Sequence, residues 1–236
     1  MRYGANPLNL SYTAVTGSYN TNIERNLLLR PRIPEDLPEP SDYAIKQIGP
    51  EFALIGKSNA GKSSMINLIT GNASLAKVSK KPGHTKTINH FLINRKWMLV
   101  DCPGYGDQPG YQVSKQERQA WHELTKEYFI QRRSLAHIFL IIDASSKLGS
   151  DDVNASTWIH DLGRPWSIIF SKLDVIQAGL PNPIDNMEST IDTLEALTGA
   201  IIPSLPTSAA TGFGKEGVLK YISSLRQNFK TPLIFK

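Results

Sequence analysis

Short apolar runs alternate with amphipathic segments from residue 51 onward. Six runs have the length and the composition of strands: residues 52–55, 87–93, 97–101, 138–143, 167–170 and 201–207. Five amphipathic segments between or after them predict helices: residues 62–70, 115–132, 151–162, 187–197 and 215–228. Because strands that alternate with helices form βα units, this pattern predicts an α/β fold with a mainly parallel sheet.

Two local signals refine this pattern. Asn94 and Arg95 separate the second and third predicted strands closely enough for a hairpin, which predicts one antiparallel edge strand. Asp185 and Glu188 have the spacing of a capping box and would place the start of the fourth helix beside them.

The first 50 residues follow a different pattern. Residues 1–26 are rich in Asn, Ser, Thr and Tyr without helical or strand periodicity, and five prolines follow between residues 31 and 50. Proline fixes φ and removes a backbone donor. We therefore expect residues 1–50 to form an extended arm and residues 51–236 to form the folded domain.

Composition excludes several classes of protein. The chain has 236 residues, 40% hydrophobic and 20% charged, which is typical of a globular protein and not of a disordered one. The longest apolar run, residues 135–144, is about half of the ~20 residues that span a bilayer, so we expect no membrane partner. A single cysteine, Cys102, excludes an internal disulfide and a Cys-rich zinc site, and we expect it to be buried.

Charge is unevenly placed along the chain. The formal net charge is +5, and residues 72–96 contain five lysines, one arginine and two histidines but no acidic residue. A basic surface attracts polyanions such as RNA, although a run of charge is as often only a solvated face.

The strongest chemical signal follows the first predicted strand. Residues 56–63 match GxxxxGK[ST], the pattern of a phosphate-binding loop between a strand and a helix. Backbone N–H groups of such a loop surround nucleotide phosphates, and the next helix directs its positive end toward them. Lys62 would reach the β and γ phosphates, and the Ser63 hydroxyl would bind Mg²⁺. The predicted nucleotide-binding residues of this loop are Gly56, Ser58, Asn59, Ala60, Gly61, Lys62 and Ser63.

Two later segments favour guanine over adenine. After a predicted strand, Ser171-Lys172-Leu173-Asp174 places a carboxylate that can accept from the guanine ring N–H and its amino group, while the Lys172 stem covers the ring. Adenine has no matching pair of donors. Thr207-Ser208-Ala209 ends another predicted strand and resembles the loop in which a backbone N–H contacts the guanine O6.

A third segment would complete the phosphate site. Asp101-Cys102-Pro103-Gly104 follows the strand that ends near Val100. Asp101 would contact Mg²⁺ through water, and the Gly104 N–H would contact the γ phosphate, so Gly104 joins Lys62 as a predicted catalytic residue.

Together these motifs resemble those of translation-factor-class GTPases and, within that class, the EngB (YihA/YsxC) family of ribosome-assembly GTPases. The resemblance covers about residues 27–225 and rests on residues 56–64, 81–85, 101–106 and 113–121. It implies a three-layer, Ras-like P-loop GTPase domain with a six-stranded sheet. It also implies that Ser64 contacts the nucleotide and that Thr85 is the catalytic switch I threonine, which binds Mg²⁺ and closes on the γ phosphate.

The sequence departs from the family pattern at three places. Ser171 replaces the usual Thr or Asn, residues 107–111 resemble an insertion in switch II, and the N-terminal arm is longer than bacterial members need. The arm and these departures favour the mitochondrial matrix as the location, with the bacterial cytoplasm as the alternative.

The resemblance implies a GTPase switch that matures the large ribosomal subunit, with GTP or GDP, the subunit precursor and its rRNA as partners. RNA bound to residues 72–96 would sense the nucleotide, because this stretch contains Thr85. We expect a monomer. A GTP-holding structural subunit without turnover and a P-loop phosphotransferase are the alternatives, although no acceptor-binding motif supports the latter.

Two residues affect the expected rate of hydrolysis. Tyr105 follows Gly104, where Ras-like GTPases carry a water-orienting Gln, so we expect slow intrinsic hydrolysis and a catalytic group from the partner. Asn59 occupies the loop position that holds K⁺ in potassium-activated GTPases, and it can equally be a turn-forming side chain.

Overall fold

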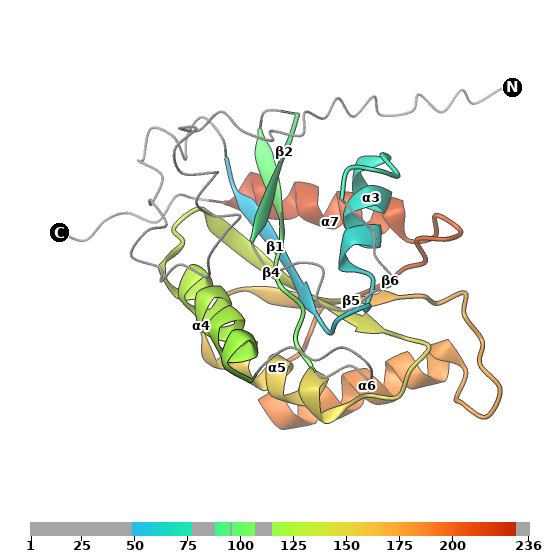
Figure 1. The fold of residues 1–236 in the computed structure, drawn as a ribbon. Helices are drawn as coiled ribbons and strands as arrows, with labels where there is room; N and C mark the ends of the chain where they lie inside the picture. Colours follow the sequence, from blue (N-terminus) through green and yellow to red (C-terminus); the bar gives the residue numbers. More distant parts are fainter. Residues whose placement is uncertain (1–48, 77–87, 95, 107–114, 230–236) are drawn as a thin grey trace, which may run out of the picture.

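The computed structural model describes residues 49–76, 88–94, 96–106 and 115–229 (Figure 1). Its elements in chain order are β1 (Glu51–Gly56), α3 (Lys62–Thr70), β2 (Asn89–Ile93), β3 (Trp97–Asp101), α4 (Lys115–Gln131), β4 (Leu135–Asp143), α5 (Ser150–Asp161), β5 (Trp166–Ser171), α6 (Pro183–Thr198), β6 (Ser204–Pro206) and α7 (Lys215–Asn228). The strands form one six-stranded sheet in the order β2-β3-β1-β4-β5-β6. β2 runs antiparallel to β3 and the other pairs are parallel, which confirms the predicted α/β sheet with its antiparallel edge strand.

Helices cover both faces of this sheet. α4, α5 and α6 lie on one face, and α3 and α7 lie on the other (Figure 1). Ala53 and Ile55 of β1 belong to the core under the first group of helices. Phe52 and Leu54 belong to the core under the second group. Because successive strand residues point to opposite faces, a strand buried on both faces is apolar throughout.

Most elements differ from their predicted extents by one to three residues, and β4 begins at Leu135 rather than at residue 138. The differences at α6 and β6 have clear local causes. α6 begins at Pro183, because the Asn182 side chain accepts the Ile184 N–H at 2.9 Å and proline suits the first helical position. The predicted cap at Asp185 is therefore wrong. β6 spans only Ser204–Pro206, since the prolines in this segment have no N–H to give to a ladder.

The predicted arm, residues 1–50, lies almost entirely outside the described residues. Cys102 is completely buried, as expected. In the part of the chain that the structure describes, every helix is too short or too polar to cross a membrane.

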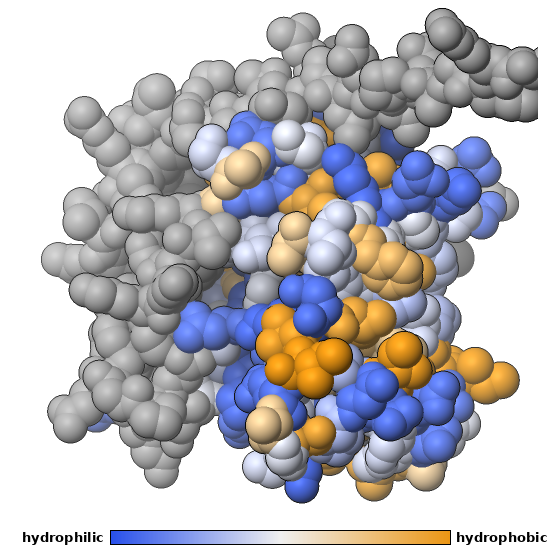
Figure 2. All heavy atoms as spheres, turned by 90° about the vertical axis from the view of Figure 1, so that its right-hand side faces the viewer, coloured by the Kyte–Doolittle hydropathy of each residue, from blue (hydrophilic) through white to orange (hydrophobic). Residues whose placement is uncertain are grey.

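Exposed apolar side chains gather on one face of the molecule. Figure 2 shows this face, which is the right-hand side of Figure 1 and includes the loop between β5 and α6. Ile176 in this loop is 83% exposed, and Ile184 at the start of α6 is 50% exposed. Apolar surface of this kind is common where a protein meets a partner.

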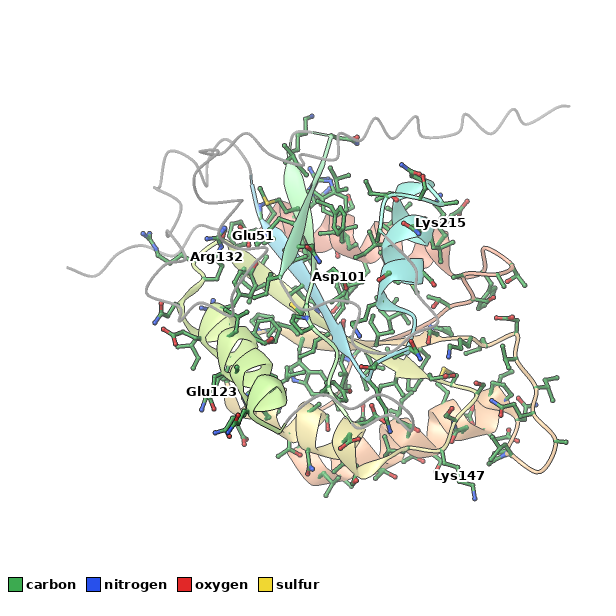
Figure 3. All side chains as sticks on the ribbon, in the orientation of Figure 1. Glu51, Asp101, Glu123, Arg132, Lys147 and Lys215 are labelled. Carbon is green, nitrogen blue, oxygen red and sulfur yellow. The ribbon has the colours of Figure 1, made fainter. Side chains whose placement is uncertain are left out.

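A buried carboxylate lies at the start of β1. Glu51 is 2% exposed and accepts hydrogen bonds from the Arg132 guanidinium at 2.8 Å, from Ser134 Oγ at 2.7 Å and from the Tyr128 hydroxyl. His90 Nε2 of β2 lies 3.6 Å from the carboxylate. Burial alone would raise the pKa of Glu51, but His90 and Arg132 outweigh burial and hold the pKa well below its usual range. This cluster joins β1, β2 and the end of α4, and Figure 3 shows Glu51 and Arg132 next to each other.

A histidine is buried between the sheet and α7. His137 of β4 is 3% exposed and packs against Phe139 and Tyr221. Its Nε2 lies 2.9 Å from Ser167 Oγ, and its Nδ1 has no hydrogen-bond partner within the described part of the chain. Burial disfavours the charged imidazolium and lowers the pKa of His137 to about 4.

Acidification should therefore destabilise the protein through His137. Its pKa is 6.5 in the unfolded chain and about 4 in the folded protein, so the unfolded chain binds the extra proton between these values. We expect this residue to remove up to about 3 kcal/mol of the unfolding free energy as the pH falls through this window. Urea denaturation at pH 7 and at pH 4.5 measures the free energy of unfolding at each pH. His137→Gln is the control, and an equal loss in both proteins would contradict the prediction.

Candidate nucleotide-binding site

The predicted site residues follow the carboxyl ends of neighbouring parallel strands. β1, β3, β5 and β6 lead into the loops that carry residues 56–64, 101–106, 171–174 and 207–209. Because parallel strands end at the same edge of a sheet, these four loops meet there (Figure 1). Thr85, the predicted switch I threonine, lies outside the described residues.

The phosphate-binding loop leaves the sheet where no side chain fits. A Cβ on Gly56 would lie 2.5 Å from the Ile141 carbonyl oxygen of the adjacent β4. The chain then curls around Lys62, whose Nζ donates to the Gly56 carbonyl at 2.9 Å and to the Lys57 carbonyl at 3.1 Å. Lys62 is 7% exposed, and burial lowers its pKa while Asp101 opposes that shift. The loop thus folds around the ammonium group that would meet the nucleotide phosphates.

Two of the three predicted magnesium residues, Ser63 and Asp101, lie side by side. Ser63 Oγ, at the start of α3, donates to Asp101 Oδ2 at 3.3 Å. Asp101 Oδ1 is buried and has no hydrogen-bond partner among the described residues (Figure 3). Burial raises the pKa of Asp101, while Lys62 and Ser63 lower it. Mg²⁺ prefers oxygen ligands, and this pair offers a hydroxyl and a carboxylate whose Oδ1 has no partner among the described residues, so the two residues fit this ion.

Gly104 lies against the phosphate-binding lysine. A Cβ on this residue would be 2.8 Å from Lys62 Nζ and 3.0 Å from Ser58 Oγ. A side chain at this position would require the Lys62 ammonium group or the Ser58 side chain to move. Its backbone is therefore close to the place where the lysine would meet a γ phosphate.

Tyr105 is tied to two neighbouring elements. Its backbone N–H donates to the Gly56 carbonyl at 3.3 Å, and its carbonyl accepts the Ser58 N–H at 3.0 Å. Its hydroxyl donates to Asp152 Oδ1 of α5 at 2.8 Å. The side chain that replaces the water-orienting Gln of Ras-like GTPases is thus engaged with α5.

The two predicted guanine-binding segments contact each other. The Ser208 hydroxyl donates to Asp174 Oδ1, and the Leu173 N–H donates to the Thr207 carbonyl at 3.2 Å. Lys172 adopts a positive φ of 59° and its Nζ pairs with Asp143 at the end of β4. Ser208 is buried and Ala209 is exposed. The carboxylate predicted to recognise guanine is thus held in place by the second segment.

Ser171 connects the guanine segment to the phosphate loop. Its hydroxyl donates to the Ala60 carbonyl at 2.6 Å and to the Ile142 carbonyl at 3.3 Å. The residue that departs from the family pattern is therefore placed to fix one loop against the other. The pattern indicated Ser171 only as a departure, and no sequence signal indicated Asp143 or Asp152.

The comparisons with known proteins identify the family. The sequence profile described as 50S ribosome-binding GTPase matches residues 51–172. A probable GTP-binding protein EngB from Christiangramia forsetii is 38% identical over 188 residues, which cover 79% of this chain and 92% of the relative. The chain belongs to the EngB family. The GTP-binding protein At2g22870 of Arabidopsis thaliana is 36% identical over 178 residues, covering 75% of this chain but 58% of that protein.

Solved structures share the EngB fold at lower identity. The crystal structure of a probable GTP-binding protein EngB has a TM-score of 0.59 and 19% identity, covering 76% of this chain and 99% of that one. The crystal structure of Era in complex with MgGDPNP and a fragment of 16S ribosomal RNA has a TM-score of 0.58 and 22% identity. The match covers 78% of this chain and 59% of that one. These neighbours show a Ras-like P-loop GTPase fold.

As a member of the EngB family, the protein is a GTPase that binds GTP and hydrolyses it to GDP and phosphate. GTPases of this kind generally use Mg²⁺, which neutralises charge that develops between the β and γ phosphates. The residues that would hold it are Ser63 and Asp101, which lie in contact. Lys62 would bind the phosphates from the buried side of the loop.

Asp174 offers a direct test of base selection. Asp174→Asn keeps the size of the side chain but replaces one acceptor oxygen with a donor. We expect GTP affinity to fall about tenfold or more, because charge-assisted hydrogen bonds are lost. We expect affinity for xanthosine triphosphate to rise, since xanthine has a carbonyl where guanine has its amino group. Titration with both nucleotides measures this, and parallel loss of both would contradict a role for Asp174 in base recognition.

Proposed function

We propose that this EngB-family chain is a GTP-hydrolysing switch that docks on the precursor of the large ribosomal subunit and its rRNA. The observation that carries the proposal is the match of residues 51–172 to a family described as 50S ribosome-binding GTPases. The basic stretch at residues 72–96 supports an RNA partner, because it contains the predicted switch I threonine, Thr85. Of this stretch, residues 77–87 and 95 lie outside the described part of the chain.

Mitochondria are the proposed location, with the bacterial cytoplasm as the alternative. The match to the Christiangramia forsetii relative covers 92% of that protein but 79% of this chain, so the unmatched length lies mainly in this chain. The N-terminal arm proposed for residues 1–50 is the sequence feature that favours an organelle.

Phosphate release from GTP on isolated ribosomal particles tests the proposal. The geometry of Tyr105 leaves no water-orienting amide after Gly104, so we expect large-subunit particles to raise kcat by about tenfold or more by supplying a catalytic group. Small-subunit particles are the control, and Lys62→Ala should abolish the rate on either particle. Greater stimulation by mitochondrial than by bacterial particles would support the proposed location.

Two outcomes would contradict this function. Equal rates with and without large-subunit particles would reject a partner-activated switch. GTP-dependent docking without any phosphate release would favour a GTP-holding structural subunit. Tighter docking with GTP than with GDP is the result that the proposed switch requires.

We also propose that K⁺ assists hydrolysis beside Asn59. This residue is exposed in the phosphate loop and adopts a positive φ of 65° next to the phosphate-binding backbone. A bound cation there would add positive charge near the reacting phosphates, as an arginine finger does. We expect faster hydrolysis in KCl than in NaCl and loss of this difference in Asn59→Ala. Equal rates of the unaltered protein in the two salts would reject the proposal.

A further inference from the structure

The N-terminal end of α5 lies beside the segment that follows β3. The Tyr105 hydroxyl donates to Asp152 Oδ1 at 2.8 Å, across 47 residues of sequence. Tyr105 directly follows Gly104, and Asp152 lies in the first turn of α5. This hydrogen bond joins the Gly104 segment to a helix on the same face of the sheet as α4 and α6.

The Asp152 side chain is also fixed by a contact within its own helix. It is the third helical residue of α5 and is 7% exposed. Its Oδ2 accepts the Gly149 N–H at 3.4 Å, so one oxygen faces the start of its own helix and the other faces Tyr105. A carboxylate fixed by its own helix is a rigid acceptor, because little side-chain freedom remains to be lost.

The backbone of Tyr105 is fixed to the phosphate loop. It donates to the Gly56 carbonyl at 3.3 Å and accepts from the Ser58 N–H at 3.0 Å. Together with the Asp152 contact, this gives the segment three attachments. Gly104 lies one residue earlier, where a Cβ would be 2.8 Å from Lys62 Nζ, so a shift of Tyr105 shifts the Gly104 N–H relative to this lysine.

We propose that Asp152 and Tyr105 are positioning residues of the GTPase site: their hydrogen bond anchors the start of switch II and so fixes the Gly104 N–H against the phosphate loop. Neither residue touches the reacting atoms. The proposal rests on the predicted contact of the Gly104 N–H with the γ phosphate. GDP lacks that phosphate, so the anchor should influence binding of GTP analogues and not of GDP.

Affinities for GMPPNP and GDP measured on the full chain with Mg²⁺ test the anchor. Tyr105→Phe removes only the hydroxyl, and Asp152→Ala removes the acceptor. Each should lower the ratio of GMPPNP affinity to GDP affinity about tenfold, with GDP affinity unchanged. The double variant should lose no more than either single variant, because both remove the same hydrogen bond. Asp152→Asn retains an acceptor oxygen and should recover part of the ratio.

Asp185→Ala is the matched control. Asp185 occupies the same third position in α6, is exposed, and should leave the ratio unchanged. Equal loss of GMPPNP and GDP affinity in Tyr105→Phe would show a merely structural role and overturn the proposal. An unchanged affinity ratio in Tyr105→Phe and Asp152→Ala would also overturn the proposal, provided that Gly104→Ala lowers the ratio. If Gly104→Ala leaves the ratio unchanged, the predicted γ-phosphate contact is itself wrong, and the proposed anchor is rejected as well.

Discussion

The close approach of β1 and β4 at Gly56 is the constraint on which the nucleotide site depends. β1 lies in the middle of the sheet between β3 and β4, and at its last residue the Ile141 carbonyl occupies the space that a Cβ would need. Glycine therefore ends the strand, and the chain curls there into the phosphate loop. The Gly56 carbonyl then accepts from Lys62, and it also accepts the N–H of Tyr105. One backbone group thus orients both the loop lysine and the segment after β3.

Two buried carboxylates, one at the start of β1 and one at the end of β3, differ in their hydrogen bonds. Glu51, at the start of β1, has both carboxylate oxygens hydrogen-bonded and a guanidinium beside it. Asp101, at the end of β3, is almost as buried but keeps Oδ1 without a partner in the described part of the chain. Burying a polar atom without a hydrogen-bond partner destabilises the folded protein. We therefore do not expect such an atom in a residue whose role is purely structural. This contrast favours a structural role for Glu51 and supports the prediction that Asp101 contributes to a Mg²⁺ site.

The local parts of the site could be predicted from sequence, and the contacts between distant segments could not. The phosphate loop is contiguous, and its function follows from backbone geometry, so residues 56–63 were sufficient to predict it. The bonds from Ser171 to Ala60 and from Tyr105 to Asp152 join residues far apart in the chain, and only the folded sheet brings them together. The start of α6 was misplaced because two overlapping capping signals compete, and Asn182 with Pro183 satisfies the helix earlier than Asp185 does.

Tyr105 connects the fold to the chemistry of hydrolysis. The Tyr105 hydroxyl has one proton, so while it donates to Asp152 it cannot also donate to an attacking water, as the amide of a Gln at this position can. The proposed anchor would place a backbone donor near the γ phosphate and so strengthen discrimination between GTP and GDP. The same hydrogen bond would leave Tyr105 without a proton to give to the attacking water. Such a switch would gain a well-defined GTP-bound state at the expense of intrinsic turnover, which suits the proposal that a partner supplies the missing catalytic group.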